Sequence, residues 1–130
     1  MTIEERGNQA ALLKATGQCN CAQAVFSVYA DKLPLTQEQL MQLGAGYAAG
    51  MGCTESTCGA LIAAVAAAGL LTEGQQTMRY AARMVSSFET HCGATICKEL
   101  KGLETGSLLC PCPECVRTAV LVLAEALDLE

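Results

Sequence analysis

The chain has 130 residues, a net charge of −5 at pH 7, a pI near 4.8 and 52% apolar residues. This composition supplies enough apolar surface for one folded domain over residues 1–130 and excludes a disordered chain. The eight lysines and arginines are scattered singly, which argues against nucleic acid or an anionic membrane surface as a partner. Cysteine is the unusual component, with nine residues.

The start of the chain and its longest apolar run bear on the compartment. Residues 1–6 include two glutamates and precede no apolar stretch, so we expect no secretory signal. The apolar run over residues 60–71 is too short to span a bilayer. We therefore expect a cytoplasmic protein, in which thiols are kept reduced. Reduced thiols favour metal ligation or redox chemistry over a disulfide framework.

In the first half of the chain, apolar residues recur at helical spacing, and strand-like alternation is missing. A capping box at Thr2 predicts a first helix that ends at Gly17. Asn20 is the N-cap of a second helix, which Pro34 ends. A capping box at Thr36 opens a third helix, which we expect to fade at the glycines of residues 50–52.

The second half continues the helical pattern. A fourth, very apolar helix carries Cys58 through Gly69, and a fifth runs from about Gly74 to Gly93. A short helix over residues 95–101 is followed by a last helix with Pro113 at its first position. The prediction is a small all-α bundle of five to six helices, with the fourth helix either central or part of a homodimer face.

The cysteines are placed unevenly on this bundle. Consecutive helices joined by short connections run antiparallel, so alternate connections meet at the same end. The connections at residues 32–36 and 71–74 contain no cysteine, and all nine fall at the opposite end. These nine candidate metal ligands are Cys19, Cys21, Cys53, Cys58, Cys92, Cys97, Cys110, Cys112 and Cys115.

Four of the cysteines, Cys21, Cys58, Cys97 and Cys115, fall in first helical turns. There the positive end of the helix dipole stabilises a thiolate, so we expect lowered pKa values at these positions. Thiolate is the form that binds metals and attacks disulfides, and amides directed at sulfur suit an iron–sulfur cluster. The alternative is that some of the nine thiols are simply small apolar core residues.

The spacing of neighbouring cysteines limits which redox or metal sites the chain can form. Cys112-Pro-Glu-Cys115 has the spacing of a redox dithiol, but no strand–helix pattern supports a thioredoxin-like fold. The residue after Cys115 is valine, which excludes a c-type haem attachment. His91 is the only histidine, and we expect a surface or metal-edge position rather than a catalytic base. Three acids near the cysteines are alternative ligands or solvated helix-start residues, namely Glu55, Glu99 and Glu114.

Four segments together resemble the C_GCAxxG_C_C family of small proteins described as redox-active. They are Asn20-Cys-Ala-Gln-Ala-Val25, Gly50-Met-Gly52 with Cys58-Gly-Ala-Leu-Ile-Ala63, Cys97-Lys-Glu-Leu100, and Cys115 before the last helix. The resemblance covers the chain from Cys19 to the last helix and differs at Ala63, where the signature has glycine. The family also resembles a domain of split-Soret-type cytochromes, although this chain lacks a haem attachment motif.

The resemblance implies a redox role and places the family's hallmark cysteines at Cys21, Cys58, Cys97 and Cys115. We expect these four to be the catalytic and cofactor-binding residues. They would either hold an iron–sulfur cluster or another metal for electron transfer, or cycle between dithiol and disulfide, in an electron carrier or an oxidoreductase. The alternative is a non-enzymatic zinc- or copper-binding structural, storage or sensor module. The redox partner is not identified by the sequence.

Overall fold

Four of the α-helices begin where the sequence supplies a polar cap or a proline. The computed structural model describes residues 1–129 and contains, within them, eight α-helices, one 3₁₀ turn and no strand. Six of the α-helices have eight or more residues. The helices are α1 (Ile3–Ala15), α2 (Cys21–Val28), α3 (Gln37–Gly44), α4 (Ala48–Met51), α5 (Gly59–Leu71), α6 (Thr77–Cys92), α7 (Cys97–Lys101) and α8 (Cys112–Leu127), with η1 (Ala30–Lys32) after α2.

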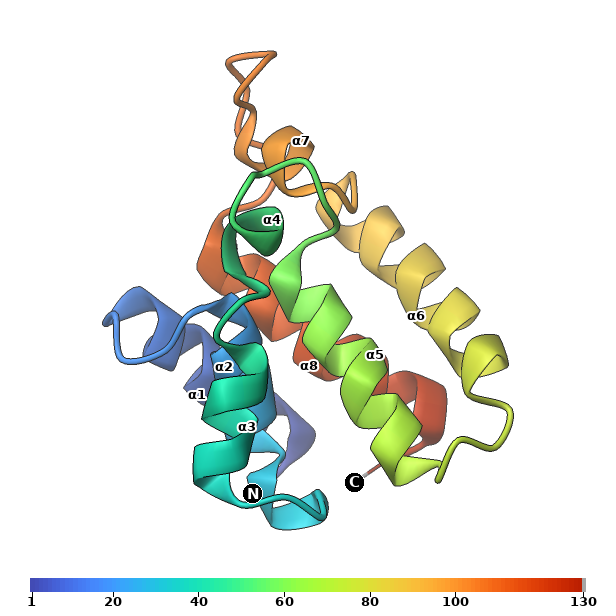
Figure 1. Ribbon diagram of the computed structural model, residues 1–130. Coiled ribbons are helices and arrows are strands. Elements are labelled where there is room, and N and C mark those ends of the chain that lie inside the picture. The colour runs from blue at the N-terminus through green and yellow to red at the C-terminus, as the bar shows by residue number, and fades with distance from the viewer. Residues whose placement is uncertain (130) are drawn as a thin grey trace.

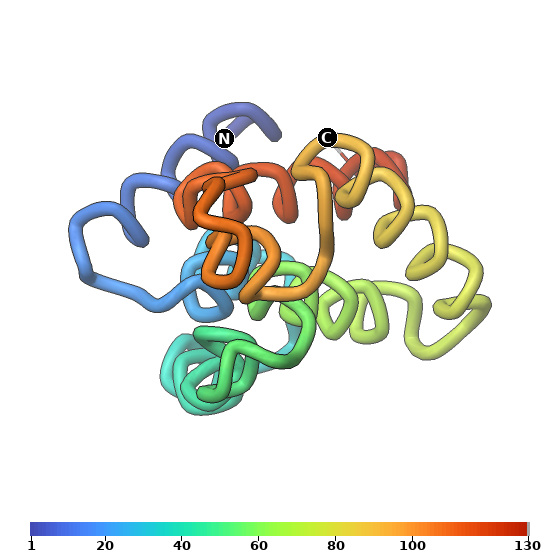
Figure 2. Tube along the Cα trace, turned by 90° about the horizontal axis from the view of Figure 1, so that it is seen from above, coloured from blue at the N-terminus to red at the C-terminus, as the bar shows by residue number. Residues whose placement is uncertain are grey.

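The long helices form a bundle in which α5 is central (Figure 1). α5 packs against α2, α6 and α8, while α1 packs mainly on α8. Seen from above, α1 and α8 lie together on one side, α3 lies on the opposite side, and α2 and α5 lie between them (Figure 2). The short helices α4 and α7 lie at one end of the bundle, and the α5–α6 connection lies at the other (Figure 1).

Small residues let α5 approach its neighbours closely. Five of its alanines are at most 1% exposed, and apart from Leu61 the largest fully buried side chains come from other segments. Tyr29 is buried and donates a hydrogen bond of 2.7 Å to the Val120 carbonyl oxygen, which joins α2 to α8. Arg6 of α1 is also buried. Its guanidinium forms two hydrogen bonds, of 2.6 and 2.8 Å, with the Asp31 carboxylate.

The predicted caps are confirmed, and the all-α class with them. Asn20 and Thr36 each form a capping box, and the Thr2 hydroxyl accepts a hydrogen bond from the Glu5 amide. The left-handed Gly93 ends α6, as expected. Pro113 is the second rather than the first residue of α8, because Cys112 already has helical geometry.

The third helix is shorter than we expected. α3 ends at Gly44, and the chain then forms the separate four-residue α4 instead of continuing to Gly50. Ala49 and Gly50 have φ values of 54° and 59°, which an uninterrupted helix does not allow. The expected count of five to six helices therefore omitted α4, and α7 was expected only as a short helix.

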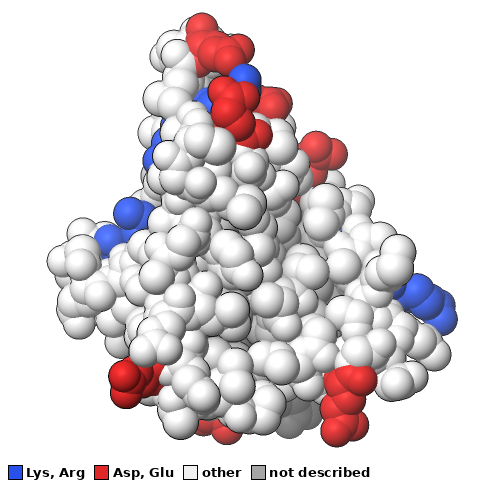
Figure 3. Space-filling view, viewed as in Figure 1, with Lys and Arg blue, Asp and Glu red and all other residues white. Residues whose placement is uncertain are grey.

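The surface matches the low charge of the sequence. Charged side chains gather at the tip of the molecule in Figure 3, and the middle of that face is uncharged. At the tip, Lys98 forms ion pairs with Glu55 at 3.1 Å and with Glu104 at 2.9 Å. Within residues 1–129 no helix is both long and apolar enough to cross a membrane.

Candidate functional site

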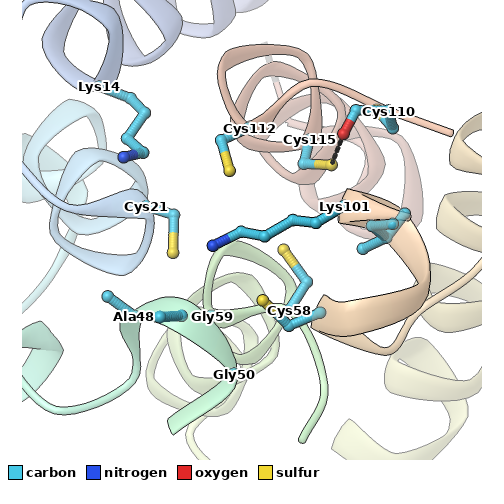
Figure 4. Close-up of a pocket in the computed structure, with 13 residues that line it drawn as sticks. Lys14, Cys21, Ala48, Gly50, Cys58, Gly59, Lys101, Cys110, Cys112 and Cys115 are labelled. Atoms are coloured by element: carbon cyan, nitrogen blue, oxygen red, sulfur yellow. Dashed lines mark hydrogen bonds between the residues drawn. The ribbon is translucent and has the colours of Figure 1, made fainter. Parts of the chain in front are cut away.

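A cavity of about 110 Å³ lies at the end of the bundle where the helix starts converge. Figure 4 shows thiols from α2, α5 and α8 facing it, together with the backbone of α4. A single water molecule needs about 10–15 Å³ of such space, so the cavity has room for a group of several atoms. Its sulfur-bearing wall consists of Cys21, Cys58, Cys97, Cys110, Cys112 and Cys115.

Cys21 is held in place by the cap of α2. The Asn20 side chain accepts a 2.8 Å hydrogen bond from the Gln23 amide and donates one of 3.1 Å to the Gly44 carbonyl oxygen. The start of α2 is thereby fixed to the end of α3. Cys21, the first residue of α2, is 7% exposed and faces the cavity.

Cys58 and Cys97 are placed side by side by backbone hydrogen bonds between two distant segments. The Cys58 amide donates to the Thr95 carbonyl oxygen at 2.7 Å, and the Cys97 amide donates to the Ser56 carbonyl oxygen at 3.0 Å. Cys58 is the N-cap of α5, and Cys97 is the first residue of α7. Two helices consequently start next to each other with a thiol at each start.

The remaining cavity thiols come from the start of α8. Cys112 is its first residue, and Cys115 lies one turn further in. The preceding loop is anchored on α7, because the Leu100 carbonyl oxygen accepts hydrogen bonds from the amides of Leu109 (3.0 Å) and Cys110 (3.3 Å). Four separate helix starts therefore bring cysteine to one cavity.

Three thiols form a second, deeper group. The Sγ atoms of Cys92, Cys110 and Cys115 all lie within 4.8 Å of one another, an arrangement suited to hold a metal ion. All three residues are buried, with at most 4% exposure. We call them the buried trio. Cys110 and Cys115 belong both to the trio and to the cavity wall, whereas Cys92, the last residue of α6, belongs only to the trio.

The thiols of the cavity wall and the buried trio differ in pKa. The Cys115 thiol donates a 3.6 Å hydrogen bond to the Cys110 carbonyl oxygen (Figure 4). It also lies beside the sulfurs of Cys58 and Cys92, and its single proton, available to one thiolate at a time, lowers the pKa of Cys58 to about 7 and that of Cys92 to about 6. The pKa of Cys115 is raised in turn, because a charged Cys115 sulfur would lie against those of Cys58 and Cys92. Burial raises the pKa of Cys110 to about 12.

The expectation that all four helix-start cysteines have lowered pKa values is therefore correct only for Cys58. The pKa of Cys21 and that of Cys97 are raised, because burial of a charged sulfur costs more than the helix amides return. The pKa of Cys115 is raised for the reason given above.

Two lysines that sequence reasoning missed also line the cavity. The amino group of Lys101 lies between Cys21 and Cys58 in the view of Figure 4, and Lys14 lines the cavity on the α1 side. The Lys101 ammonium opposes the rise in the pKa of Cys97. Both lysines end helices, where a cation is common, so no motif marks them as site residues.

The other candidates lie outside this wall. Cys19 is half-buried in the α1–α2 connection, and Cys53 is exposed. His91 is exposed near the end of α6. The three candidate carboxylates are also exposed, at Glu55, Glu99 and Glu114.

The fold and the site together define a cysteine-rich helical protein with thiols gathered at one end. Residues 19–126 match the family model described as "Putative redox-active protein (C_GCAxxG_C_C)", and the chain belongs to this family. This confirms the resemblance drawn from the sequence. A search of curated proteins and a search of solved structures each gave no match.

Proposed function

We propose that the protein transfers electrons through a metal centre, an iron–sulfur cluster, bound by thiolates in the cavity. The observation that carries the proposal is the cavity itself, which is walled by six thiols, five of them at four helix starts and one in the loop before α8, and has room for several atoms. Cysteine thiolates are the usual ligands of such clusters, and a set of four is sufficient. Cys21, Cys58 and Cys97 supply three of them, and α8 supplies the fourth.

The surroundings suit a centre of net negative charge. Backbone amides of α2 and α5 face the sulfurs of Cys21 and Cys58, and amides that face sulfur stabilise a reduced cluster. The Lys101 ammonium offsets further negative charge. When bound, the group would accept and release single electrons, while the chain's own residues position it and exclude water.

Two cysteines of α8 compete for the position of fourth ligand. Cys115 is the family's hallmark residue, but its thiol also interacts with Cys92 and Cys110. Cys112 is the first residue of α8, and its sulfur lies close enough to Cys21 and Cys97 to raise their pKa values. We propose Cys115 or Cys112 as the fourth ligand and separate them by substitution.

The test begins with iron, sulfide and the visible spectrum of protein purified without oxygen. We expect a brown protein, and we expect Cys58→Ser to remove most of the iron and colour. Cys53→Ser is the matched control, because Cys53 is exposed and off the cavity wall, and it should keep both. The fourth ligand is whichever of Cys112→Ser and Cys115→Ser loses more iron. Colourless wild-type protein without iron would refute the proposal.

One observation favours a second candidate function, a redox-active dithiol. The thiols of Cys58 and Cys92 have lowered pKa values because each lies beside the Cys115 thiol, which suits attack by a thiolate. In that chemistry two thiols lose two electrons and two protons to an oxidant and form one disulfide. Thiol counts before and after oxidation of the metal-free protein would then fall by two, whereas a pure metal ligand set would show no defined step.

A further inference from the structure

The buried trio shares Cys110 and Cys115 with the cavity wall, but its third member, Cys92, lies outside the cavity and makes a second set of sulfur ligands. Its three sulfurs come from the end of α6, the loop before α8 and the first turn of α8. Without Cys110 and Cys115, the cavity wall still has four thiols, each at the first residue or N-cap of a helix. These four are Cys21, Cys58, Cys97 and Cys112.

We propose that Cys92, Cys110 and Cys115 bind one soft metal ion, Cu⁺ or Zn²⁺, in a second site beside the cavity. This inference goes beyond the proposed electron-transfer centre and does not depend on it. It assigns Cys112, rather than Cys115, to the cavity centre, because Cys115 is then occupied by the ion.

The donor chemistry defines the class of ion. The site offers three sulfurs, and thiolates select soft ions such as Cu⁺ and Zn²⁺ over Mg²⁺, Ca²⁺ or Mn²⁺. A Zn–S bond is about 2.3 Å, which places sulfurs about 3.8 Å apart around a tetrahedral ion. Sulfurs that already lie within 4.8 Å of one another would need to move together by about 1 Å at most.

A buried hydroxyl group lies next to one of the three proposed ligands. Thr118 is 5% exposed on α8, and its hydroxyl lies close enough to the Cys92 sulfur to help lower the pKa of that thiol. Groups that hydrogen-bond to a ligand orient it and typically change metal affinity by about 10–100-fold. Thr118 is therefore placed to orient Cys92 as a ligand.

The two ions differ in the fourth ligand they need. Structural zinc is almost always bound by four ligands, and Cys58, a neighbour of Cys115, offers a further thiol. Three thiolates alone suit Cu⁺, which accepts three-coordination. Dependence on Cys58 therefore distinguishes zinc from copper at the same site.

The experiment titrates the reduced, full-length protein separately with Cu⁺ and with Zn²⁺ against a chromophoric chelator in the absence of oxygen. We expect one tightly bound ion that survives in the Cys21→Ser/Cys97→Ser double variant. In Cys92→Ser and in Cys110→Ser the affinity should fall by more than the 10–100-fold typical of groups that only support ligands. Cys53→Ser is the matched control. A further loss in Cys58→Ser identifies zinc, and no change identifies copper.

A second measurement uses the wild-type protein and so does not depend on whether the variants fold. X-ray absorption of the wild-type protein with one equivalent of ion should show three sulfur neighbours for copper or four for zinc. Oxygen or nitrogen neighbours would overturn the proposal, and so would loss of the ion in the Cys21→Ser/Cys97→Ser variant. Iron and sulfide content report on the cavity centre independently, so failure of one proposal is distinguishable from failure of the other.

Discussion

The Cys115 thiol influences the charge of two neighbouring thiols. Cys58 and Cys92 have pKa values of about 7 and about 6, below the ordinary 9.0, mainly because the Cys115 thiol beside them can donate its proton to either thiolate. The Thr118 hydroxyl adds to the effect at Cys92. At neutral pH this end of the metal-free protein consequently carries thiolate, the form required for metal binding.

The pH dependence of thiolate absorbance tests this arrangement. In metal-free protein we expect an ultraviolet thiolate step between about pH 6 and pH 7, well below the ordinary pKa of 9.0. Cys115→Ala removes the hydrogen-bond donor, so the step should move up toward pH 9. Cys53→Ala should leave the midpoint unchanged. A wild-type protein whose first step lies at pH 9 would contradict the hydrogen-bonding arrangement.

The lowered pKa of Cys92 also determines whether the protein becomes more or less stable as the pH rises. A thiol whose pKa is lower in the folded state binds fewer protons there than in the unfolded state. Its contribution to the free energy of unfolding is therefore complete above pH 9 and is lost as the pH falls through about 6. The buried thiols with raised pKa values are protonated in both states below pH 9 and contribute no slope there. The free energy of unfolding should thus rise with pH across this window, by at most about 1.4 kcal/mol per pH unit for each thiolate.

At the scale of the helix, the start of α5 depends on a residue without a side chain. A Cβ atom at Gly59 would lie 2.9 Å from the Cys21 sulfur and would also collide with the Tyr47 carbonyl oxygen. Gly59 thereby lets α5 approach both α2 and the segment before α4. The glycine that follows Cys58 in the sequence signature thus serves the spacing between two thiols.

Gly59→Ala should therefore separate Cys21 from Cys58. We expect it to destabilise the protein by about 1–3 kcal/mol through overpacking and to lower its metal content. Gly69→Ala in the same helix is the control, because a Cβ there would meet nothing closer than Thr77 at 3.9 Å. It should gain up to about 1 kcal/mol from helix propensity and keep its metal. Thermal unfolding and metal analysis measure both, and equal effects would contradict the role of Gly59.

The long helices were predictable from sequence because their signals are local. The caps at Asn20 and Thr36 and the glycine at 93 determine where helices start or stop through contacts within a few residues. Residues 45–57 were not predictable, since Ala49 and Met51 adopt positive φ values that their side chains do not favour. Packing against the α5 and α7 starts holds that segment in place.

The gathering of thiols could be predicted from helix direction alone, but their grouping could not. Cys92 and Cys110 were expected as candidate metal ligands beyond the four hallmark cysteines, and the structure groups them with Cys115 in the buried trio. Lys14 and Lys101 reach the cavity from helices that carry no distinguishing motif. Each of these contacts joins segments that are far apart in the chain, which local spacing does not encode.

For the molecule as a whole, the two ends of the bundle are stabilised differently. One end holds large apolar side chains such as Phe26 and Tyr29 and the Arg6–Asp31 ion pair. At the other end α4 and α7 have only four and five residues, too few to be stable alone. The buried hydrophobic residues of segments 45–58 and 93–111 are Cys58, Ala94, Cys97, Leu100 and Cys110. Cysteine thus forms most of this small core.

Metal ligation should consequently order one end of the protein more than the other. We expect metal removal to speed amide hydrogen exchange at least about tenfold in segments 45–58 and 93–111, where ligation would replace a missing apolar core. The amides in the middle of α5 and α8 should change far less, because those helices pack on each other and on α2 and α6. Exchange measured by mass spectrometry on metal-loaded and metal-free protein makes the comparison. Uniform acceleration would mean that the metal stabilises the entire bundle, and unchanged exchange at the thiol end would mean that thiol packing alone holds it.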